Sequence, residues 1–217
     1  MKTDDRARCK HIGDEGEKKL FGKTVSVAGL GGAGAKLIGL LARENLNLRL
    51  VDRGRVEEED MHRLSLYYEE DITKFKVKQA KARLLAINPT VQVKSFHEEI
   101  TDESFFLFKG DVMVDATNND EINAMTLVGV PKKKIPLLIV RYSGSKARIL
   151  VLQKKAPAKL LEKIAFKGLE EEGVYGPIAS VAGSLAAGEV LKVLLGEKKS
   201  YIVEVDIWTS KMKVVKL

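Results

Sequence analysis

Four glycines and one aspartate near the start of the chain have the types and spacing of a nucleotide-binding motif. The glycines occupy positions 29, 31, 32 and 34 in the stretch GLGGAG, and Asp52 follows at the end of an apolar run. Gly29 permits a tight turn, Gly31 lets backbone N–H groups approach a phosphate, and Gly34 lets a helix pack close to a strand. A carboxylate about 20 residues further along can hold ribose hydroxyls. The pattern predicts a nucleotide site without telling NAD, FAD and ATP apart.

Two cations downstream have the chemistry of phosphate ligands. Arg63 lies in a long polar stretch over 53–71, and Lys76 opens an expected helix. A planar guanidinium and an ammonium group together could neutralise the charge that builds on a triphosphate during attack at the α-phosphorus. A plainer interpretation stays open, in which Arg63 pairs with Glu58 or Glu59 and Lys76 is simply solvated.

The elements that must position these residues follow from the hydrophobic pattern. Strands are expected over 24–27, 46–51, 91–96, 111–115, 137–141, 147–152, 200–206 and 211–216. Helices are expected over 13–20, 75–88, 101–108 and 177–195, and directly after the glycine turn. Because strands and helices alternate until the turn at 143–145, we predict an α/β fold. It is a Rossmann-like, mostly parallel sheet with helices on both faces and an antiparallel C-terminal part.

Ligands of open parallel sheets bind beyond the carboxyl ends of the strands. Three such ends carry polar groups in this chain: the glycine turn, Asp52 with the loop that contains Arg63, and residues 115–120. We therefore expect these three segments to form one site.

The order of these motifs resembles that of ThiF/MoeB-type adenylyltransferases, relatives of ubiquitin-activating enzymes that prime small sulfur-carrier proteins. The motifs are the glycine turn, Leu-x-Leu-Val-Asp52, Val56, Arg63, Lys76-Val77, Ile87-Asn88-Pro89 and Asp115-x-Thr117-x-Asn119. The resemblance covers residues 16–196, including 173–177 and 183–185. It implies ATP- and Mg²⁺-dependent adenylation of the C-terminal glycine of a ubiquitin-like sulfur carrier that ends in Gly-Gly. It also implies release of pyrophosphate and a homodimer.

The resemblance assigns nucleotide contacts to Gly29, Gly31, Gly32, Gly34, Asp52, Asp60, Arg63, Lys76, Asn118 and Asn119. In this assignment Gly32 lies against the nucleotide and Asp52 holds the ribose. Arg63 and Lys76 grip the phosphates and act in catalysis. An arginine that reaches the site from the partner subunit would be Arg6 or Arg8.

The chain departs from the family pattern at two of these positions. The family's asparagine before the arginine is Asp60 here, and its magnesium aspartate is Asn118. A neutral amide oxygen is a weaker ligand for Mg²⁺ than a carboxylate, so no metal ligand is assigned. Asp115 or Asp120 could compensate.

Cysteine usage sets a further limit. Cys9 is the single cysteine, so the paired Cys-x-x-Cys zinc motifs are missing and the resemblance is to a short, zinc-less member. No cysteine falls in the expected crossover over 156–173. Adenylation is compatible with this, but a covalent cysteine relay through the crossover is not. We expect Cys9 to be an ordinary thiol.

Composition bounds the class of protein. A chain of 217 residues fits one domain, 1–217, with a sizeable core. The net charge of +7 is spread along the chain without a basic stripe interleaved with aromatic residues, which argues against nucleic-acid binding. Residues 1–23 are too polar for a signal peptide, and 177–195 is expected to be a buried helix rather than a membrane span. We therefore expect a cytoplasmic protein.

Two rival functions remain open from the sequence. Tyr142 and Lys146 match the Tyr-x-x-x-Lys pair of NAD(P)-dependent short-chain dehydrogenases, but that pair needs one helical turn and Gly144 lies between them. The other rival is a non-catalytic relative that binds a nucleotide or carrier without turnover, which Asn118 and the missing cysteines would suit. The sequence does not identify the carrier.

Overall fold

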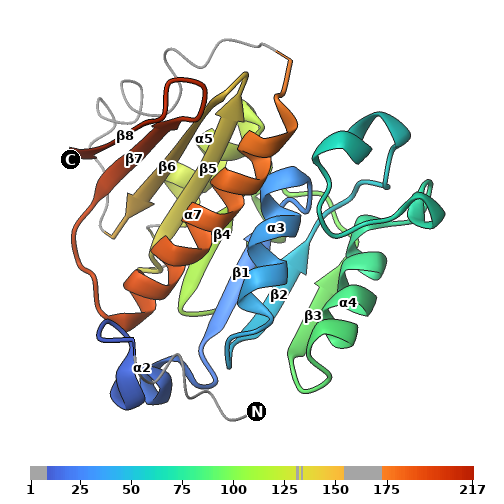
Figure 1. Ribbon diagram of the computed structural model, residues 1–217. Coiled ribbons are helices and arrows are strands. Elements are labelled where there is room, and N and C mark those ends of the chain that lie inside the picture. The colour runs from blue at the N-terminus through green and yellow to red at the C-terminus, as the bar shows by residue number, and fades with distance from the viewer. Residues whose placement is uncertain (1–8, 131, 133, 154–172) are drawn as a thin grey trace.

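The computed structural model describes residues 9–130, 132, 134–153 and 173–217, and its strands form one eight-stranded sheet (Figure 1). The strand order is β3-β2-β1-β4-β5-β6-β7-β8. The strands are β1 (Thr24–Ala28), β2 (Asn47–Val51), β3 (Gln92–Phe96), β4 (Val112–Asp115), β5 (Leu137–Ser143), β6 (Lys146–Leu152), β7 (Tyr201–Asp206) and β8 (Lys211–Lys216). All eight were predicted, with boundaries within one residue except that β5 continues two residues further, to Ser143.

The sheet has a parallel half and an antiparallel half, as predicted. The strands from β3 to β5 are parallel neighbours, and those from β5 to β8 are antiparallel. The central strands are apolar on both sides, and Val25, Val27 and Val114 have no exposed surface. This is the pattern of parallel strands that are covered by helices on both faces.

Helices cover the two faces unequally (Figure 1). The described α-helices are α2 (Gly13–Leu20), α3 (Gly32–Leu41), α4 (Lys76–Ile87), α5 (Asp120–Gly129) and α7 (Gly176–Leu195). The helices α3, α4 and α7 share one core cluster on the face turned to the viewer, whereas α5 joins a second cluster on the opposite face. The prediction of helices on both faces is confirmed.

Three short 3-10 helices complete the described elements: η1 (Glu58–Arg63), η2 (Glu69–Asp71) and η3 (Glu103–Leu107). The first two give regular structure to the loop that was expected to be irregular, and the third replaces the helix expected over 101–108. The helix α5 was not predicted. The expected crossover over 156–173 lies outside the described residues, except for Gly173.

The helix α7 packs closely on α3 because its inner face is made of small residues. A Cβ atom added to Gly183 would lie 2.4 Å from the carbonyl oxygen of Ala33, so only glycine fits at this crossing. By length and apolar composition α7 is also a candidate membrane span, but nine of its residues are buried in the protein. The prediction of a buried helix fits this arrangement.

Candidate active site

A cavity of about 390 Å³ opens at the carboxyl ends of the parallel strands. Its volume lies in the range of small-molecule sites. It brings together eight of the ten residues proposed as nucleotide contacts, namely Gly29, Gly31, Asp52, Asp60, Arg63, Lys76, Asn118 and Asn119. The expectation that three strand ends form one site therefore agrees with the geometry.

The glycine turn forms one wall of this cavity. Gly29 has a φ of +82°, which a side chain would disfavour, and an added Cβ would lie 2.7 Å from the backbone of Thr117. An added Cβ on Gly31, which precedes α3, would meet nothing within 4 Å. At Gly34 it would lie 2.0 Å from the carbonyl oxygen of Gly29. The turn thus exposes backbone to the cavity at Gly31 and needs close packing at the other two positions.

At Gly32, the space that a side chain would occupy is taken by neighbouring elements. Gly32 does not line the cavity, and an added Cβ would lie 2.7 Å from the Cβ of Ala179 on α7. The same position is 3.1 Å from both the carbonyl oxygen of Arg63 and the hydroxyl of Tyr142. Gly32 therefore makes room for three neighbouring elements at the start of α3.

Asp52 ties the end of β2 to the glycine turn. Its Oδ2 accepts a hydrogen bond from the N–H of Leu30 at 2.7 Å, and its Oδ1 accepts one from the N–H of Gly54 at 2.5 Å. Each carboxylate oxygen can accept more than one hydrogen bond. Asp52 can therefore still receive hydroxyl groups from the cavity while it fixes the shape of the turn.

Asp60 holds the two predicted cations together. Its carboxylate pairs with the Nη2 of Arg63, within η1, and lies 3.3 Å from the Nζ of Lys76 at the start of α4. Asp60 is buried and Lys76 nearly so, with 12% of its side chain exposed. Neither plainer interpretation holds, because Arg63 pairs with Asp60 rather than with Glu58 or Glu59, and Lys76 is largely buried against Asp60.

The charge state of Asp60 follows from these neighbours. Burial alone would raise the pKa of its carboxyl, but the charges and hydrogen bonds of Lys76 and Arg63 outweigh burial and lower it. Asp60 is therefore ionised at neutral pH. The three groups together carry one net positive charge, and they place two cations side by side at the mouth of the cavity.

Asn118, the expected magnesium position, is bonded to the backbone of β5. Its Oδ1 accepts from the N–H of Tyr142 at 3.1 Å, and its Nδ2 donates to the carbonyl oxygen of the same residue at 3.2 Å. Asn118 has a φ of +56°, a conformation that asparagine tolerates better than most residues. Its side chain thus extends the pairing of the sheet.

Asp115 cannot take over a metal-binding role. It has no exposed surface, and its two oxygens accept from the N–H and the hydroxyl of Thr117, from the amide of Asn123 and from the hydroxyl of Thr126. These four hydrogen bonds use the acceptor capacity of the carboxylate. Asp115 is a structural group that fixes the segment after β4.

Two further polar residues after β4 also have defined partners. The Oδ1 of Asn119 accepts from the N–H of Ile122 and caps α5, while Asp120 pairs with Arg141 at 2.8 Å. Asp120 does not line the cavity, and 69% of its side chain is exposed. Among the described residues, no group of three His, Cys, Asp or Glu side chains could hold a metal ion.

The sequence reasoning missed several cavity residues. Outside the three expected segments, Ile100 and Ile122 contribute apolar groups, and Glu98, Glu99 and Tyr142 contribute polar ones. Residues 98–100 follow β3 within four residues, so the rule that ligands lie beyond strand ends could have found them. Tyr142 had been considered only as half of a dehydrogenase pair.

The dehydrogenase pair is absent from the geometry. Tyr142 is buried in β5, whereas Lys146 is exposed at the start of β6, on the other side of a turn. The side chains do not share a helical turn, as the glycine between them predicted. Of the remaining candidates, Cys9 is exposed and free, while Arg6 and Arg8 lie outside the described residues.

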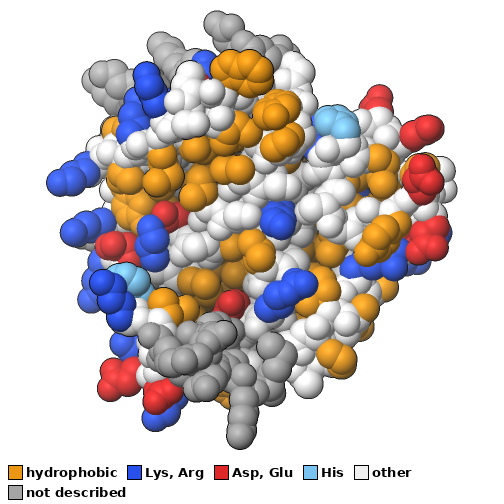
Figure 2. All heavy atoms as spheres, viewed as in Figure 1, with side chains coloured by type: hydrophobic (Ala, Val, Ile, Leu, Met, Phe, Trp, Pro, Cys, Tyr) orange, Lys and Arg blue, Asp and Glu red, His pale blue; other side chains and the backbone are white. Residues whose placement is uncertain are grey.

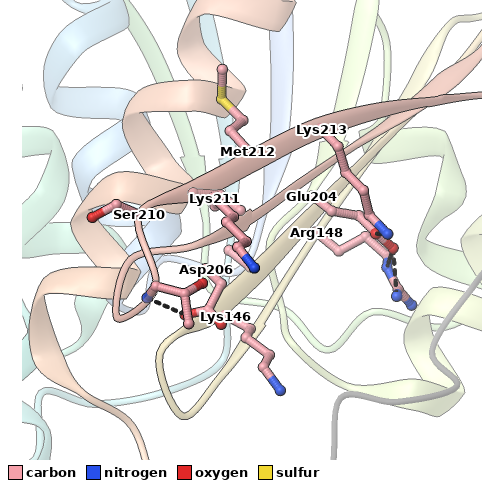
Figure 3. A pocket seen from close by; sticks show the side chains of 11 residues that line it. Lys146, Arg148, Glu204, Asp206, Ser210, Lys211, Met212 and Lys213 are labelled. Atoms are coloured by element: carbon pink, nitrogen blue, oxygen red, sulfur yellow. Dashed lines mark hydrogen bonds and ion pairs between the residues drawn. The ribbon is translucent and has the colours of Figure 1, made fainter.

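A second groove, of about 620 Å³, lies on the antiparallel part of the sheet (Figure 3). Its charged side chains come from β6, β7 and β8. Glu204 bridges Arg148 and Lys213 there, as the dashed lines show. This groove lacks a glycine turn, and its strand-end carboxylate, Asp206, ends an antiparallel strand rather than a parallel one. The first cavity is therefore the candidate active site.

Comparison with known proteins points to one family. The ThiF family profile matches residues 4–217. The chain is 31% identical over 208 residues to a sulfur carrier protein adenylyltransferase of Thermus thermophilus, covering 85% of this chain and 74% of that protein. It is 27% identical over 217 residues to the molybdopterin-synthase adenylyltransferase of Escherichia coli, covering 94% and 86%.

Solved structures show the same fold. The E. coli protein MccB, in a crystal structure with ATP, superposes with a TM-score of 0.79 at 20% sequence identity. The match covers 92% of this chain and 65% of MccB, so this chain spans about two thirds of the length of that neighbour.

Proposed function

Because the chain belongs to the ThiF family, we propose that it adenylates the C-terminal glycine of a small ubiquitin-like sulfur carrier with ATP. The curated relatives named above are adenylyltransferases of this kind. The observation that carries the proposal is the single cavity that joins the glycine turn and Asp52 to the paired cations Arg63 and Lys76. We further propose that residues 1–217 act as one nucleotide-binding domain in the cytoplasm.

ATP would lie along the cavity in a definite direction. The ribose hydroxyls would donate to Asp52, and the triphosphate would reach Arg63 and Lys76. Ile100 and Ile122 supply apolar surface for the adenine. The Nε of Arg63 supports this placement, since it is buried without a hydrogen-bond acceptor among the described residues. An anion beside the guanidinium would provide an acceptor.

The reaction brings two anions together. A carboxylate oxygen of the carrier would form a bond to the α-phosphorus while the bond between that phosphorus and the oxygen of the β-phosphate breaks, and pyrophosphate would leave with the electron pair. The barrier is therefore largely electrostatic, and fixed cations lower it. Arg63 and Lys76 are held in place by Asp60 before ATP arrives, so little reorganisation is needed.

Magnesium is part of the proposal, with Asp60 as its protein ligand. Mg²⁺ is usually held by one or two carboxylates together with substrate phosphates and water, and Asp60 is the ionised carboxylate beside the two cations. When bound, the ion would neutralise charge on the phosphates. Each oxygen of Asp60 keeps acceptor capacity beyond its bond to Arg63 or Lys76, whereas the neutral amide oxygen of Asn118 is a weaker ligand for Mg²⁺. Asp60→Asn should raise the Mg²⁺ concentration that half-saturates activity, and an unchanged requirement would refute this assignment.

We also propose a homodimer, as the family resemblance implies. Figure 2 shows hydrophobic side chains gathered on the face that carries α7 and the antiparallel strands. Met212 and Val214 of β8 are more than half exposed there. On α7 itself, Ser184 and Gly188 are exposed, and an added Cβ on Gly188 would meet nothing within 4 Å. Ser184 and Gly188 form an exposed outer stripe on α7, and this outer stripe leaves room for a second subunit.

Exchange of labelled pyrophosphate into ATP tests the proposed activity. Exchange should require a ubiquitin-like protein that ends in Gly-Gly, and the same carrier without its last glycine should not support it. ATP binding without exchange, for every carrier tried, would favour the non-catalytic alternative. Binding of NAD(P) without ATP would favour an oxidoreductase instead.

A further inference from the structure

Tyr142 is a rigidly placed tyrosine at the inner wall of the cavity. It lies near the end of β5, is 5% exposed, and pairs with Ala147 of β6. On its other side, the side-chain amide of Asn118 holds both its N–H and its carbonyl oxygen. The backbone of Tyr142 is therefore fixed from both sides, and this fixes where the ring can point.

The hydroxyl of Tyr142 lies at the first turn of α3. The Cβ position on Gly32 is 3.1 Å from this hydroxyl, so the phenolic oxygen lies beside the start of α3. Helix N-termini present donors that have no partner within the helix. A phenolic oxygen beside such donors can accept from one of them and still donate its own proton to a ligand. Tyr142 also lines the cavity, beside Arg63 and Asp60, so a ligand there is within the reach of this side chain.

The hydroxyl keeps its proton at neutral pH. Burial raises the pKa of Tyr142; Arg63 opposes this rise and Asp60 adds to it, and the pKa remains above its ordinary value. Tyr142 is thus a neutral donor whose oxygen is polarised by the start of a helix. Such a group presents a hydrogen bond to an anion without adding a charge.

We propose that Tyr142 is a catalytic residue whose O–H donates to a non-bridging oxygen of the α-phosphate of ATP. This inference rests on the proposed function for the identity of the nucleotide. The ribose hydroxyls are placed at Asp52, which is bonded to the glycine turn. The α-phosphate is joined directly to the ribose and is therefore the phosphate nearest to that turn. The donor would oppose the negative charge that collects on the α-phosphate oxygens during attack.

Tyr67 provides a matched control. It is also a buried tyrosine, and its hydroxyl donates to the carbonyl oxygen of Leu30 in the same glycine turn at 2.9 Å. It does not line the cavity. Tyr67→Phe therefore removes a buried hydrogen bond from the turn without removing a donor from the site, whereas Tyr142→Phe removes the donor.

The test compares the affinities of the three proteins for AMP and adenosine by calorimetry. The wild type and Tyr67→Phe should bind AMP more tightly than adenosine by the same factor. In Tyr142→Phe this affinity ratio should be about ten times smaller, as expected for the loss of a hydrogen bond to a charged group. Retention of the full preference in Tyr142→Phe, an equal loss in Tyr67→Phe, or the absence of nucleotide binding in the wild type would overturn the inference. The comparison needs no carrier, so it is decided separately from the exchange assay.

A kinetic readout separates donation from packing. With a competent carrier, Tyr142→Phe should lower the kcat of pyrophosphate exchange roughly 100-fold, the weight of one such donor, with a much smaller change in the KM for ATP. Difluorotyrosine at position 142, a stronger acid, should retain activity at neutral pH and move the alkaline limb of the pH profile to lower pH. An unmoved alkaline limb, or an unchanged kcat in Tyr142→Phe, would contradict the role.

Discussion

The side-chain amide of Asn118 pairs with both backbone polar groups of Tyr142, at 3.1 and 3.2 Å. An asparagine at the end of one strand thus continues the hydrogen bonding of the next. The arrangement needs an acceptor and a donor on the same side chain, which an aspartate cannot provide when ionised.

Replacement of Asn118 by aspartate should therefore be harmful. The change places a carboxylate oxygen against the carbonyl oxygen of Tyr142, which should destabilise the protein by about 1–3 kcal/mol and slow pyrophosphate exchange. Asn119→Asp is the control for stability, because the Oδ1 of Asn119 accepts from the N–H of Ile122 and aspartate caps helices equally well. Thermal unfolding compares the two variants, and the exchange rate is measured for Asn118→Asp against the wild type. A faster Asn118→Asp enzyme with tighter Mg²⁺ dependence would instead identify a weakened metal site.

Asp52 should contribute to ATP affinity through the ribose. Asp52→Ala removes acceptors for the N–H groups of Leu30 and Gly54 as well as for the ribose hydroxyls, so lower stability alone proves little. ATP affinity should fall by about 1–3 kcal/mol. Titration with 2′,3′-dideoxy-ATP isolates the contribution of the ribose hydroxyls to affinity. The wild type should bind this analogue more weakly than ATP, and Asp52→Ala should bind the two nucleotides with equal affinity. Equal discrimination in the two proteins would place the ribose elsewhere.

Asp71 should contribute to stability in a pH-dependent way. It is 1% exposed and accepts from Arg83 at 2.9 Å and from the N–H of Tyr68 at 3.1 Å. Burial raises the pKa of Asp71, but the hydrogen bonds from Arg83 and from the N–H of Tyr68 lower it by more than burial raises it. The pKa of Asp71 is therefore below its ordinary value. A depressed carboxyl pKa stabilises the fold above the unfolded pKa of about 4, and this contribution is lost as the pH falls through the folded value.

Denaturant unfolding between pH 7 and pH 3 checks this expectation. Asp71→Asn should cost about 1–3 kcal/mol at pH 7, and the difference from wild type should shrink as the medium becomes acidic. Glu70→Gln is the control, since Glu70 binds the same Arg83 but 70% of its side chain is exposed; exposed pairs contribute about 0–1 kcal/mol. A difference for Asp71→Asn that persists at pH 3 would argue against an electrostatic origin.

The outer stripe of α7 predicts how the dimer can be broken. Arginine at position 188 should be accepted by the isolated subunit, because a Cβ there meets open space and glycine is a poor helix former. Light scattering should give a dimer for the wild type and a larger monomer fraction for Gly188→Arg. Ala82→Arg, at an exposed position of α4, should remain dimeric. A wild-type monomer of 24.0 kDa at micromolar concentration would contradict the homodimer and any role of Arg6 or Arg8 across subunits.

Local patterns were sufficient to predict most of the fold and the place of the site. The strands have apolar runs of the right length, and the glycine turn with Asp52 predicts one βαβ unit because all its contacts are close in sequence. The helix α5 was missed because its apolar residues do not form a clear stripe. Its start nevertheless carries a signal, an Asn119 cap followed by two acidic residues.

The partners of the site residues could not be predicted in the same way. The pairing of Asp60 with Lys76 joins η1 to α4, and that of Asn118 with Tyr142 spans 24 residues between β4 and β5. Such contacts depend on how strands and loops meet in space, which periodicity does not encode. The orientation of Gly32 toward α7 is a third case, because α7 follows it by more than 100 residues in the sequence.

Mass spectrometry of the carrier after incubation with ATP and the Cys9→Ser protein tests adenylation most directly. An acyl-adenylate needs cations but no thiol, so the cysteine-free protein should add one AMP to a carrier that ends in Gly-Gly, at the wild-type rate. Arg63→Gln should form the same adduct roughly 100 to 1,000 times more slowly. If ATP binds but no carrier that ends in Gly-Gly gains AMP, or if the adduct forms equally fast without Arg63, the account is contradicted.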